Sequence, residues 1–249
     1  MIIIKNDKEI DLMRIAGRIV AETLLLVEKK VKPGITTAEL DRIAEEFITK
    51  HGATPSFKGL YGFPASLCIS VNEQVVHGIP GGYVLKEGDI VSVDCGAHIN
   101  GFHGDAARTF AVGNISEEAN KLIKVTEESF FKGLEFAKVG NRLTDISHEI
   151  QRYVEASGFS VVRDFVGHGI GRSVHEDPEI PNFGRPGRGP KLVTGMTLAI
   201  EPMVNMGTYR VATLGDDWTV VSADKSLSAH YENTVVILPD GPEILTLIK

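Results

Sequence analysis

The sequence has few cysteines, no long apolar run and no cluster of basic residues. Only Cys68 and Cys95 occur in 249 residues, and both lie in strand-like runs, so we expect reduced core thiols and neither a disulfide framework nor a cysteine-ligated zinc site. No segment approaches the roughly 18 apolar residues of a membrane span. The N-terminus lacks the apolar segment of a signal peptide, which favours a cytoplasmic location. The net charge of −7 and the absence of a Lys/Arg run argue against nucleic acid as a partner.

What is present is typical of one globular domain. The chain is 43% apolar and 24% charged, and no Pro/Gly/Ser-rich linker divides it, so we expect a single domain over residues 1–249. P-loop, H-E-x-x-H and G-x-S-x-G motifs are missing, and the glycines at 167–171 do not complete a dinucleotide-binding fingerprint. These absences argue against nucleotide-dependent chemistry, helix-borne zinc proteases and serine hydrolases.

Apolar periodicity predicts two pairs of helices, each followed by strands. The first pair begins at Asn6-Asp7 and ends at Gly52, with a capping-box pattern at Thr36 and a stop signal at 32–34. The second pair covers about 116–137 and 144–156. The predicted strands are 67–71, 89–95, 107–112, 160–163, 196–201, 219–221, 230–238 and 243–248.

The two helix pairs align when the numbering is shifted by 106 residues. Gly34 then falls on Gly140 and Gly52 on Gly158. Any two amphipathic helices align in part, so a chance match is the alternative to a duplication. A duplication predicts two halves, about 1–112 and 113–249, with a shared site at the seam between them.

A predicted hairpin brings two aspartates together. Asn100-Gly101 between strand-like runs is typical of a two-residue turn, which pairs Asp94 with Ala107 and places Asp94 and Asp105 on one face. Their β-carbons are then about 7 Å apart, within reach of one cation. The alternative is a pair of solvent-facing aspartates, but the apolar flanks predict burial, where a like-charged pair needs a positive partner.

Further candidate ligands lie downstream. Two histidines, His168 and His175, stand seven residues apart in a glycine-rich segment, Glu201 ends an apolar strand, and Glu232 lies inside another. Each alone has a structural interpretation, such as a hydrogen-bonded histidine or a glutamate paired with arginine. Together with the two aspartates, His168 and the glutamates form a set of four carboxylates and one imidazole. This set suits two divalent ions of the Mn²⁺, Fe²⁺, Co²⁺ or Zn²⁺ class and hydrolytic chemistry.

With these residues in place, the sequence resembles the bacterial-type (type I) methionine aminopeptidases over essentially its whole length. The motifs that carry the resemblance are Val71-Asn-Glu-Gln-Val-Val-His77-Gly-Ile-Pro80, Val93-Asp94-x9-Gly104-Asp105, Gly167-His168-Gly-Ile-Gly171-x3-His175-Glu176-x-Pro178, Met196-x4-Glu201-Pro202 and Glu232-Asn-Thr234. The resemblance implies an α+β fold, the duplicated pita-bread fold, with a pseudo-twofold antiparallel sheet covered by two helix pairs.

The resemblance also implies roles. The metal ligands are Asp94, Asp105, His168, Glu201 and Glu232, and a metal-bridging hydroxide attacks the carbonyl of an N-terminal methionine with Glu201 as general base. His175 stabilises the tetrahedral intermediate, and His77 assists the leaving amine; both contact the substrate. The methionine pocket involves Tyr61, Phe63, Cys68 and Trp218. Without the resemblance, these four would be interpreted as ordinary core.

Four positions depart from the family pattern: Asn233, His230, Tyr61 and Val174. None is a metal ligand, so they affect the shape of the pocket and the surroundings of the ligands, and the reaction is unchanged. The implied substrates are N-terminal peptides of nascent proteins with a small second residue, with the ribosome as a candidate meeting place and a monomer as the expected state. The alternatives are a proline-directed relative, an aminopeptidase P or prolidase, and an inactive peptide-binding module of the same fold.

Overall fold

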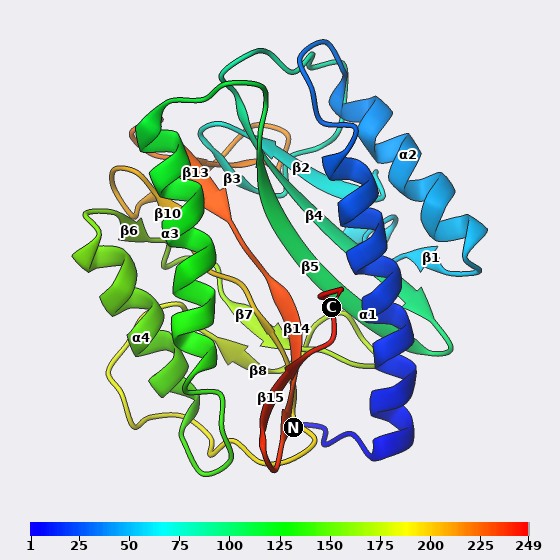
Figure 1. The fold of residues 1–249 in the computed structure, drawn as a ribbon, viewed down its shortest axis with the longest axis vertical. Coiled ribbons are helices and arrows are strands. Elements are labelled where there is room, and N and C mark those ends of the chain that lie inside the picture. The colour runs from blue at the N-terminus through cyan, green and yellow to red at the C-terminus, as the bar shows by residue number, and fades with distance from the viewer. Residues whose placement is uncertain (249) are drawn as a thin grey trace.

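Two pairs of helices flank a set of antiparallel strands (Figure 1). The computed structural model describes residues 1–248. Helices α1 (Asp7–Glu28) and α2 (Thr37–Lys50) form the first pair, and α3 (Glu117–Leu134) and α4 (Leu143–Ala156) form the second. Each predicted helix is therefore confirmed to within a few residues.

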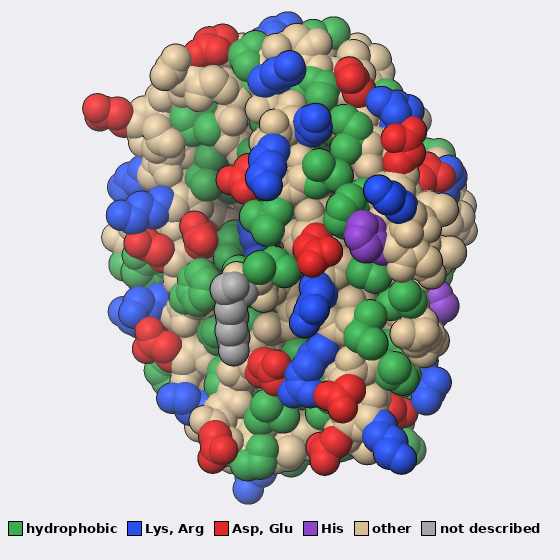
Figure 2. Space-filling view, turned by 45° about the vertical axis from the view of Figure 1, so that its right-hand side comes forward, with side chains coloured by type: hydrophobic (Ala, Val, Ile, Leu, Met, Phe, Trp, Pro, Cys, Tyr) green, Lys and Arg blue, Asp and Glu red, His purple; other side chains and the backbone are tan. Residues whose placement is uncertain are grey.

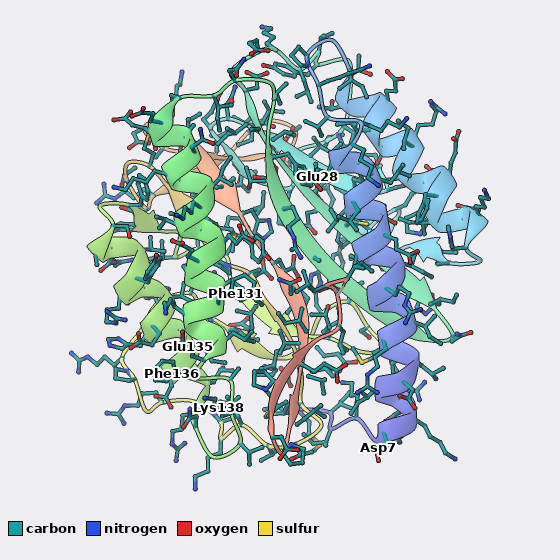
Figure 3. The ribbon with its side chains drawn as sticks, viewed as in Figure 1. Asp7, Glu28, Phe131, Glu135, Phe136 and Lys138 are labelled. Carbon is teal, nitrogen blue, oxygen red and sulfur yellow. The ribbon has the colours of Figure 1, made fainter. Side chains whose placement is uncertain are left out.

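Helix starts are fixed by local side chains. Asn6 accepts a hydrogen bond from the Glu9 amide while the Glu9 carboxylate accepts one from the Asn6 amide, which completes a capping box at α1. Thr36 caps α2 in the predicted place. Figure 3 labels Asp7 and Glu28 at the two ends of α1, and α1 lies across strands β4 and β5.

The strands form two larger and two smaller sheets. The first larger sheet has the order β1-β4-β2 with β5 also paired to β4, and the second has the order β15-β14-β9-β7-β8; β13-β10-β6 and β11-β12-β3 are the smaller sheets. The strands are β1 (Thr54–Pro55), β2 (Leu67–Val71), β3 (Gln74–Val76), β4 (Ile90–Ile99), β5 (Phe102–Ala111), β6 (Ser160–Val161), β7 (Gly167–Gly169), β8 (Glu176–Ile180), β9 (Thr197–Ile200), β10 (Met203–Asn205), β11 (Val211–Thr213), β12 (Val220–Ser222), β13 (Ser228–His230), β14 (Asn233–Leu238) and β15 (Gly241–Ile244), with a short 3-10 helix η1 (Leu60–Gly62) after β1.

The offset of 106 residues holds for several elements of the structure. It superposes the bounds of α2 on those of α4 and the bounds of β1 on those of β6. Gly34 and Gly140 even share a φ of 93°. Separate apolar cores lie under the two pairs: Leu40, Ile48 and Val93 belong to the first, and Phe130, Ile146 and Leu198 to the second. The limits of the halves, about residue 112, stay a prediction.

Several predicted strands were wrong in extent. The predicted strand 230–238 is divided into β13 and β14, because residues 231–232 leave the ladder. The predicted strand 243–248 is instead β15, which ends at Ile244. The short strands β1, β3, β7, β8, β10 and β11 were not predicted, because two to five residues carry too little alternation to be recognised.

On the face shown in Figure 2, acidic and basic side chains are interspersed, with no block of one sign. Among residues 1–248, no helix combines the length and apolar character needed to cross a lipid bilayer.

Candidate metal centre and substrate cavity

The predicted hairpin and its register are confirmed. Asn100 and Gly101 adopt φ angles of 53° and 81°, as a type I′ turn between β4 and β5 requires. Asp94 pairs with Ala107, and Gly96 with Asp105. The two aspartates therefore share one face of the hairpin.

The remaining candidate ligands come from the second half of the chain. His168 lies in the middle of β7, and Glu201 directly follows β9. Glu232 was expected inside a strand, but it occupies the break between β13 and β14. That expectation was wrong because the chain bends at 231–232 to pair with β5 instead of continuing β13.

Backbone bonds join the two halves at this break. The Glu232 amide donates to the Ala107 carbonyl at 3.0 Å, and the Ala107 amide donates to the Glu232 carbonyl at 3.3 Å. The Thr234 hydroxyl accepts from the Asp105 amide at 3.0 Å and donates to the Asp105 carbonyl at 2.9 Å. Two carboxylates that are 127 positions apart are thus held side by side by main-chain geometry.

The ligand atoms converge. One ligand atom each of Asp105, His168 and Glu232 lies within 4.8 Å of the others. His168 Nε2 is 3.5 Å from Glu201 Oε1 and 4.0 Å from Asp105 Oδ2. His168 Nδ1 is 2.9 Å from the Gly169 carbonyl, to which it donates, and this leaves the Nε2 lone pair facing the carboxylates.

Burial controls the electrostatics of the cluster. It raises the pKa of Asp94 to about 7. Burial and the neighbouring carboxylates also raise the pKa values of Asp105 and Glu232 well above the usual range, and the same holds for Glu201. Burial lowers the pKa of His168 to about 4, so its imidazole is neutral at pH 7. Protein charges alone leave this cluster of carboxylates uncompensated.

The residues fit a metal centre. Asp94 Oδ1, Asp105 Oδ1 and Glu232 Oε1 are buried and have no hydrogen-bond partner among the described residues. A buried carboxylate oxygen without a partner costs free energy unless a cation binds it. Oxygen donors with one neutral imidazole are ligands for divalent first-row metals. The site therefore has the ligand atoms and the uncompensated negative charge of a divalent metal site.

The cluster opens on a cavity of about 710 Å³. His77 and His175 also line it. His77 lies edge-on to Phe165, with ring centroids 5.5 Å apart, and has a φ of 60°, which is unusual for a residue other than glycine. Burial lowers its pKa to about 4. His175 lies edge-on to His168, with centroids 4.5 Å apart.

The four predicted pocket residues all line this cavity, but not equivalently. Phe63 and Cys68 are buried, and Trp218 packs edge-on against Phe63 with centroids 5.1 Å apart. Tyr61 is 77% exposed and stacks parallel to His175 at 6.0 Å, so it lies at the mouth of the cavity. Sequence reasoning missed Phe57, Leu60, Val76, Phe165 and Met203, which also line the cavity and carry no local signal beyond being apolar.

Three departures from the family pattern surround Glu232 and the pocket. Arg108 Nη1 donates to the Glu232 carbonyl at 2.5 Å and Nη2 donates to Asn233 Oδ1 at 2.7 Å, so Asn233 holds the arginine that supports Glu232. His230 Nε2 is 3.8 Å from Glu201 Oε2 and 4.0 Å from Glu232 Oε2. Val174 is buried with Phe63 and Cys68.

Fold and site together define a metal-dependent hydrolase. The sequence matches metallopeptidase family M24 over residues 11–239, and the chain belongs to this family. Among its relatives are the methionine aminopeptidase of Clostridium perfringens, 80% identical over the full length of both chains, and methionine aminopeptidase 1 of Bacillus subtilis, 58% identical over the full length of both. The methionine aminopeptidase structure from Thermotoga maritima has a TM-score of 0.98 at 49% identity and covers both chains completely.

The comparisons confirm the predicted resemblance and the pita-bread fold. A prolidase from Pyrococcus furiosus superposes with a TM-score of 0.82 over 99% of this chain and 66% of that one, but at 23% identity, which shows a common fold alone. The proline-directed alternative is therefore not favoured. The roles of the individual site residues stay predictions.

Proposed function

We propose that this chain removes the N-terminal methionine from peptides and nascent proteins whose second residue is small. The observation that carries the proposal is a buried cluster of four carboxylates and His168 that opens on a cavity with an apolar, aromatic wall. The full-length similarity to methionine aminopeptidases supports the substrate class. The inactive-module alternative is disfavoured, because all five candidate ligands are present.

Two divalent ions complete the site in this proposal. Asp94, Asp105, His168, Glu201 and Glu232 hold them, since four carboxylates carry the charge that two divalent cations neutralise. Mn²⁺, Fe²⁺, Co²⁺ and Zn²⁺ are the candidates for this donor set. When bound, such ions polarise a carbonyl and lower the pKa of water, which is the chemistry that peptide hydrolysis needs.

Protein side chains then guide the proton transfers. Glu201 accepts the proton of the attacking water, because its carboxylate lies among the ligand residues on the wall of the cavity. His175 donates a hydrogen bond to the carbonyl oxygen as negative charge develops there. His77, which lines the cavity beside Phe165, contacts the scissile amide nitrogen and assists the leaving amine.

Phe63, Cys68 and Trp218 receive the methionine side chain, with Tyr61 at the mouth. A thioether packs favourably against aromatic rings, and the small Cys68 leaves room for it. The free amino group of the substrate faces the carboxylate cluster, which restricts cleavage to chain ends. We further propose a cytoplasmic monomer that acts on nascent chains, with the ribosome as the candidate meeting place and neither nucleic acid nor membrane as a partner.

The test is hydrolysis of Met-Ala-Ser, its formylated form and an Xaa-Pro peptide by enzyme titrated with Mn²⁺ or Co²⁺. We expect cleavage of the free-amino methionine peptide alone. Preference for Xaa-Pro would overturn the substrate. Absence of bound divalent metal together with no activity after its addition would instead favour a binding module.

A further inference from the structure

A buried ion pair lies beside the cavity and takes no part in the proposed chemistry. Lys5 Nζ contacts Glu176 Oε2, and the two side chains are only 2% and 5% exposed. Lys5 comes from the segment before α1, whose first residue, Asp7, is labelled in Figure 3. Glu176 is the residue directly after His175. The pair therefore links the N-terminal segment to the strand end that carries a proposed substrate-binding histidine.

Glu176 organises the turn that precedes His175. Its Oε1 accepts hydrogen bonds from the Arg172 amide at 2.8 Å and the Ser173 amide at 3.3 Å. Its other oxygen is left for Lys5. A carboxylate that accepts two amides and one ammonium is held from three sides, so the turn 171–176 has a defined shape.

Lys5 also fills the space over Gly171. A β-carbon added to Gly171 would lie 2.3 Å from Lys5 Cε and 2.6 Å from Nζ, so a side chain at this position would displace the end of Lys5. The ammonium donates to the Ile3 carbonyl at 3.1 Å as well. The aliphatic chain and the ammonium group of Lys5 are thus packed against the backbone of the turn, so this ion pair is part of the packed interior and differs from an exposed surface ion pair.

The other end of Lys5 is fixed to the sheet of the metal centre. The Lys5 amide donates to the Gly195 carbonyl at 2.8 Å, and the Gly195 amide donates to the Ile237 carbonyl at 2.9 Å. Gly195 lies just before β9, which leads to Glu201, and Ile237 is in β14, which follows Glu232. Lys5 therefore connects the strands next to Glu201 and Glu232 with the turn that leads to His175.

Within residues 1–248, the ring nitrogens of His175 form no hydrogen bond. Its neighbours are the exposed ring of Tyr61 at 6.0 Å and the edge of His168 at 4.5 Å. Its position on the cavity wall thus depends on the backbone that carries it, and that backbone is held by Glu176.

We propose that Lys5 is a positioning residue for His175: its buried ion pair with Glu176 fixes the turn 171–176 and thereby the place of the His175 ring. The inference rests on the proposed role of His175 toward the substrate. Loss of one partner leaves a buried, uncompensated charge that shifts the turn, and small displacements of a catalytic group reduce turnover strongly.

The kinetic test measures three variants: Lys5→Met, Glu176→Gln and the double variant that carries both substitutions. Arg172→Met is the control. Arg172 also lies in the turn 171–176 and forms an ion pair with Glu9 of α1. Its side chain is 62% exposed, so its loss leaves no buried charge, and it is the matched control. We expect Lys5→Met to lower kcat on Met-Ala-Ser about tenfold or more, with KM within about threefold and bound metal unchanged. Glu176→Gln also lowers kcat. The double variant is more active than Lys5→Met, because Gln keeps an acceptor for the amides and no charge stays buried. Arg172→Met stays within about twofold of the parent.

A double-mutant cycle of Lys5→Met with His175→Ala distinguishes an effect through His175 from a general disturbance of the active site. If Lys5 acts through His175, Lys5→Met changes kcat less than about twofold in the His175→Ala background. The same tenfold loss in that background, or a loss of bound metal in Lys5→Met, would overturn the proposal.

Hydrogen exchange gives a readout that needs no activity. In Lys5→Met we expect the Arg172 and Ser173 amides to exchange at least tenfold faster than in the parent, while β4 amides do not change. Unchanged exchange at the turn would contradict the proposal. If the parent fails to cleave methionine peptides with any metal, the proposed function fails, while the exchange result still decides whether Lys5 holds the turn.

Discussion

Removing divalent ions is expected to make the protein progressively less stable as the pH rises from about 4 to about 7. Asp94 has a pKa of about 7 in the folded chain without metal, against 3.8 as its ordinary value. Between these values the folded state holds a proton that the unfolded state has lost. Stability therefore falls with rising pH in this window, and above it the penalty is fully present.

The loss of unfolding free energy can be worked out from the raised pKa of Asp94. A difference of about three pKa units at about 1.4 kcal/mol each gives a cost of about 4 kcal/mol from Asp94 at pH 8. Asp105, Glu201 and Glu232 shift in the same direction, so they add to the trend. Bound cations remove this cost, because they stabilise the ionised carboxylates.

The assay is urea unfolding of chelator-treated and Mn²⁺-loaded protein at pH 5.5, 7 and 8. The difference in unfolding free energy between the two forms isolates the metal centre, since the distant surface carboxylates titrate alike in both. We expect this difference to grow by several kcal/mol with pH, and to grow less in Asp94→Asn, whose amide does not ionise. A difference that is independent of pH would refute the reasoning.

Three further outcomes are expected. His175→Ala keeps its bound metal and loses about 10²-fold in kcat, because a transition-state hydrogen bond is removed; loss of metal measured in the purified variant would make His175 a ligand instead. Methionine release from Met-Xaa peptides falls from Xaa Gly or Ala to Leu, and equal rates across the series would reject a narrow pocket beside His77. Gly104→Ala lowers the unfolding free energy by about 2 kcal/mol, because the new methyl group would lie 2.8 Å from the Gly17 amide nitrogen of α1. Gly215→Ala, with nothing within 4 Å, is its control in the same thermal or urea melt, and equal stability of the two variants would contradict the clash.

The hairpin was predictable because its determinants are local. Asn100-Gly101 selects one turn type, the turn fixes the register, and the register decides that Asp94 and Asp105 share a face. The helix pairs were predictable for the same reason, since Asn6 and Thr36 cap helices through residues three positions away.

What the residues alone did not predict depends on contacts that are distant in sequence. Glu232 leaves its strand because the main chain pairs with Ala107, and no pattern near position 232 encodes that partner. Tyr61 lies at the mouth of the cavity because its backbone has a φ of 51°, which a short apolar window does not reveal. The Lys5–Glu176 pair joins residues 171 positions apart, and a single lysine near the N-terminus carries no signal of burial.

The pairing of Thr234 with Asp105 has a consequence for when activity arises. These residues are 129 positions apart, and the bonds between them align the carboxylates of both halves. A newly made chain that has not yet reached residue 232 has its two aspartates but not the fourth carboxylate, so it cannot assemble the complete ion-binding set. If these residues hold the ions as proposed, the complete ion-binding set forms only after residues 232–234 have been made and have paired with the hairpin that carries Asp105.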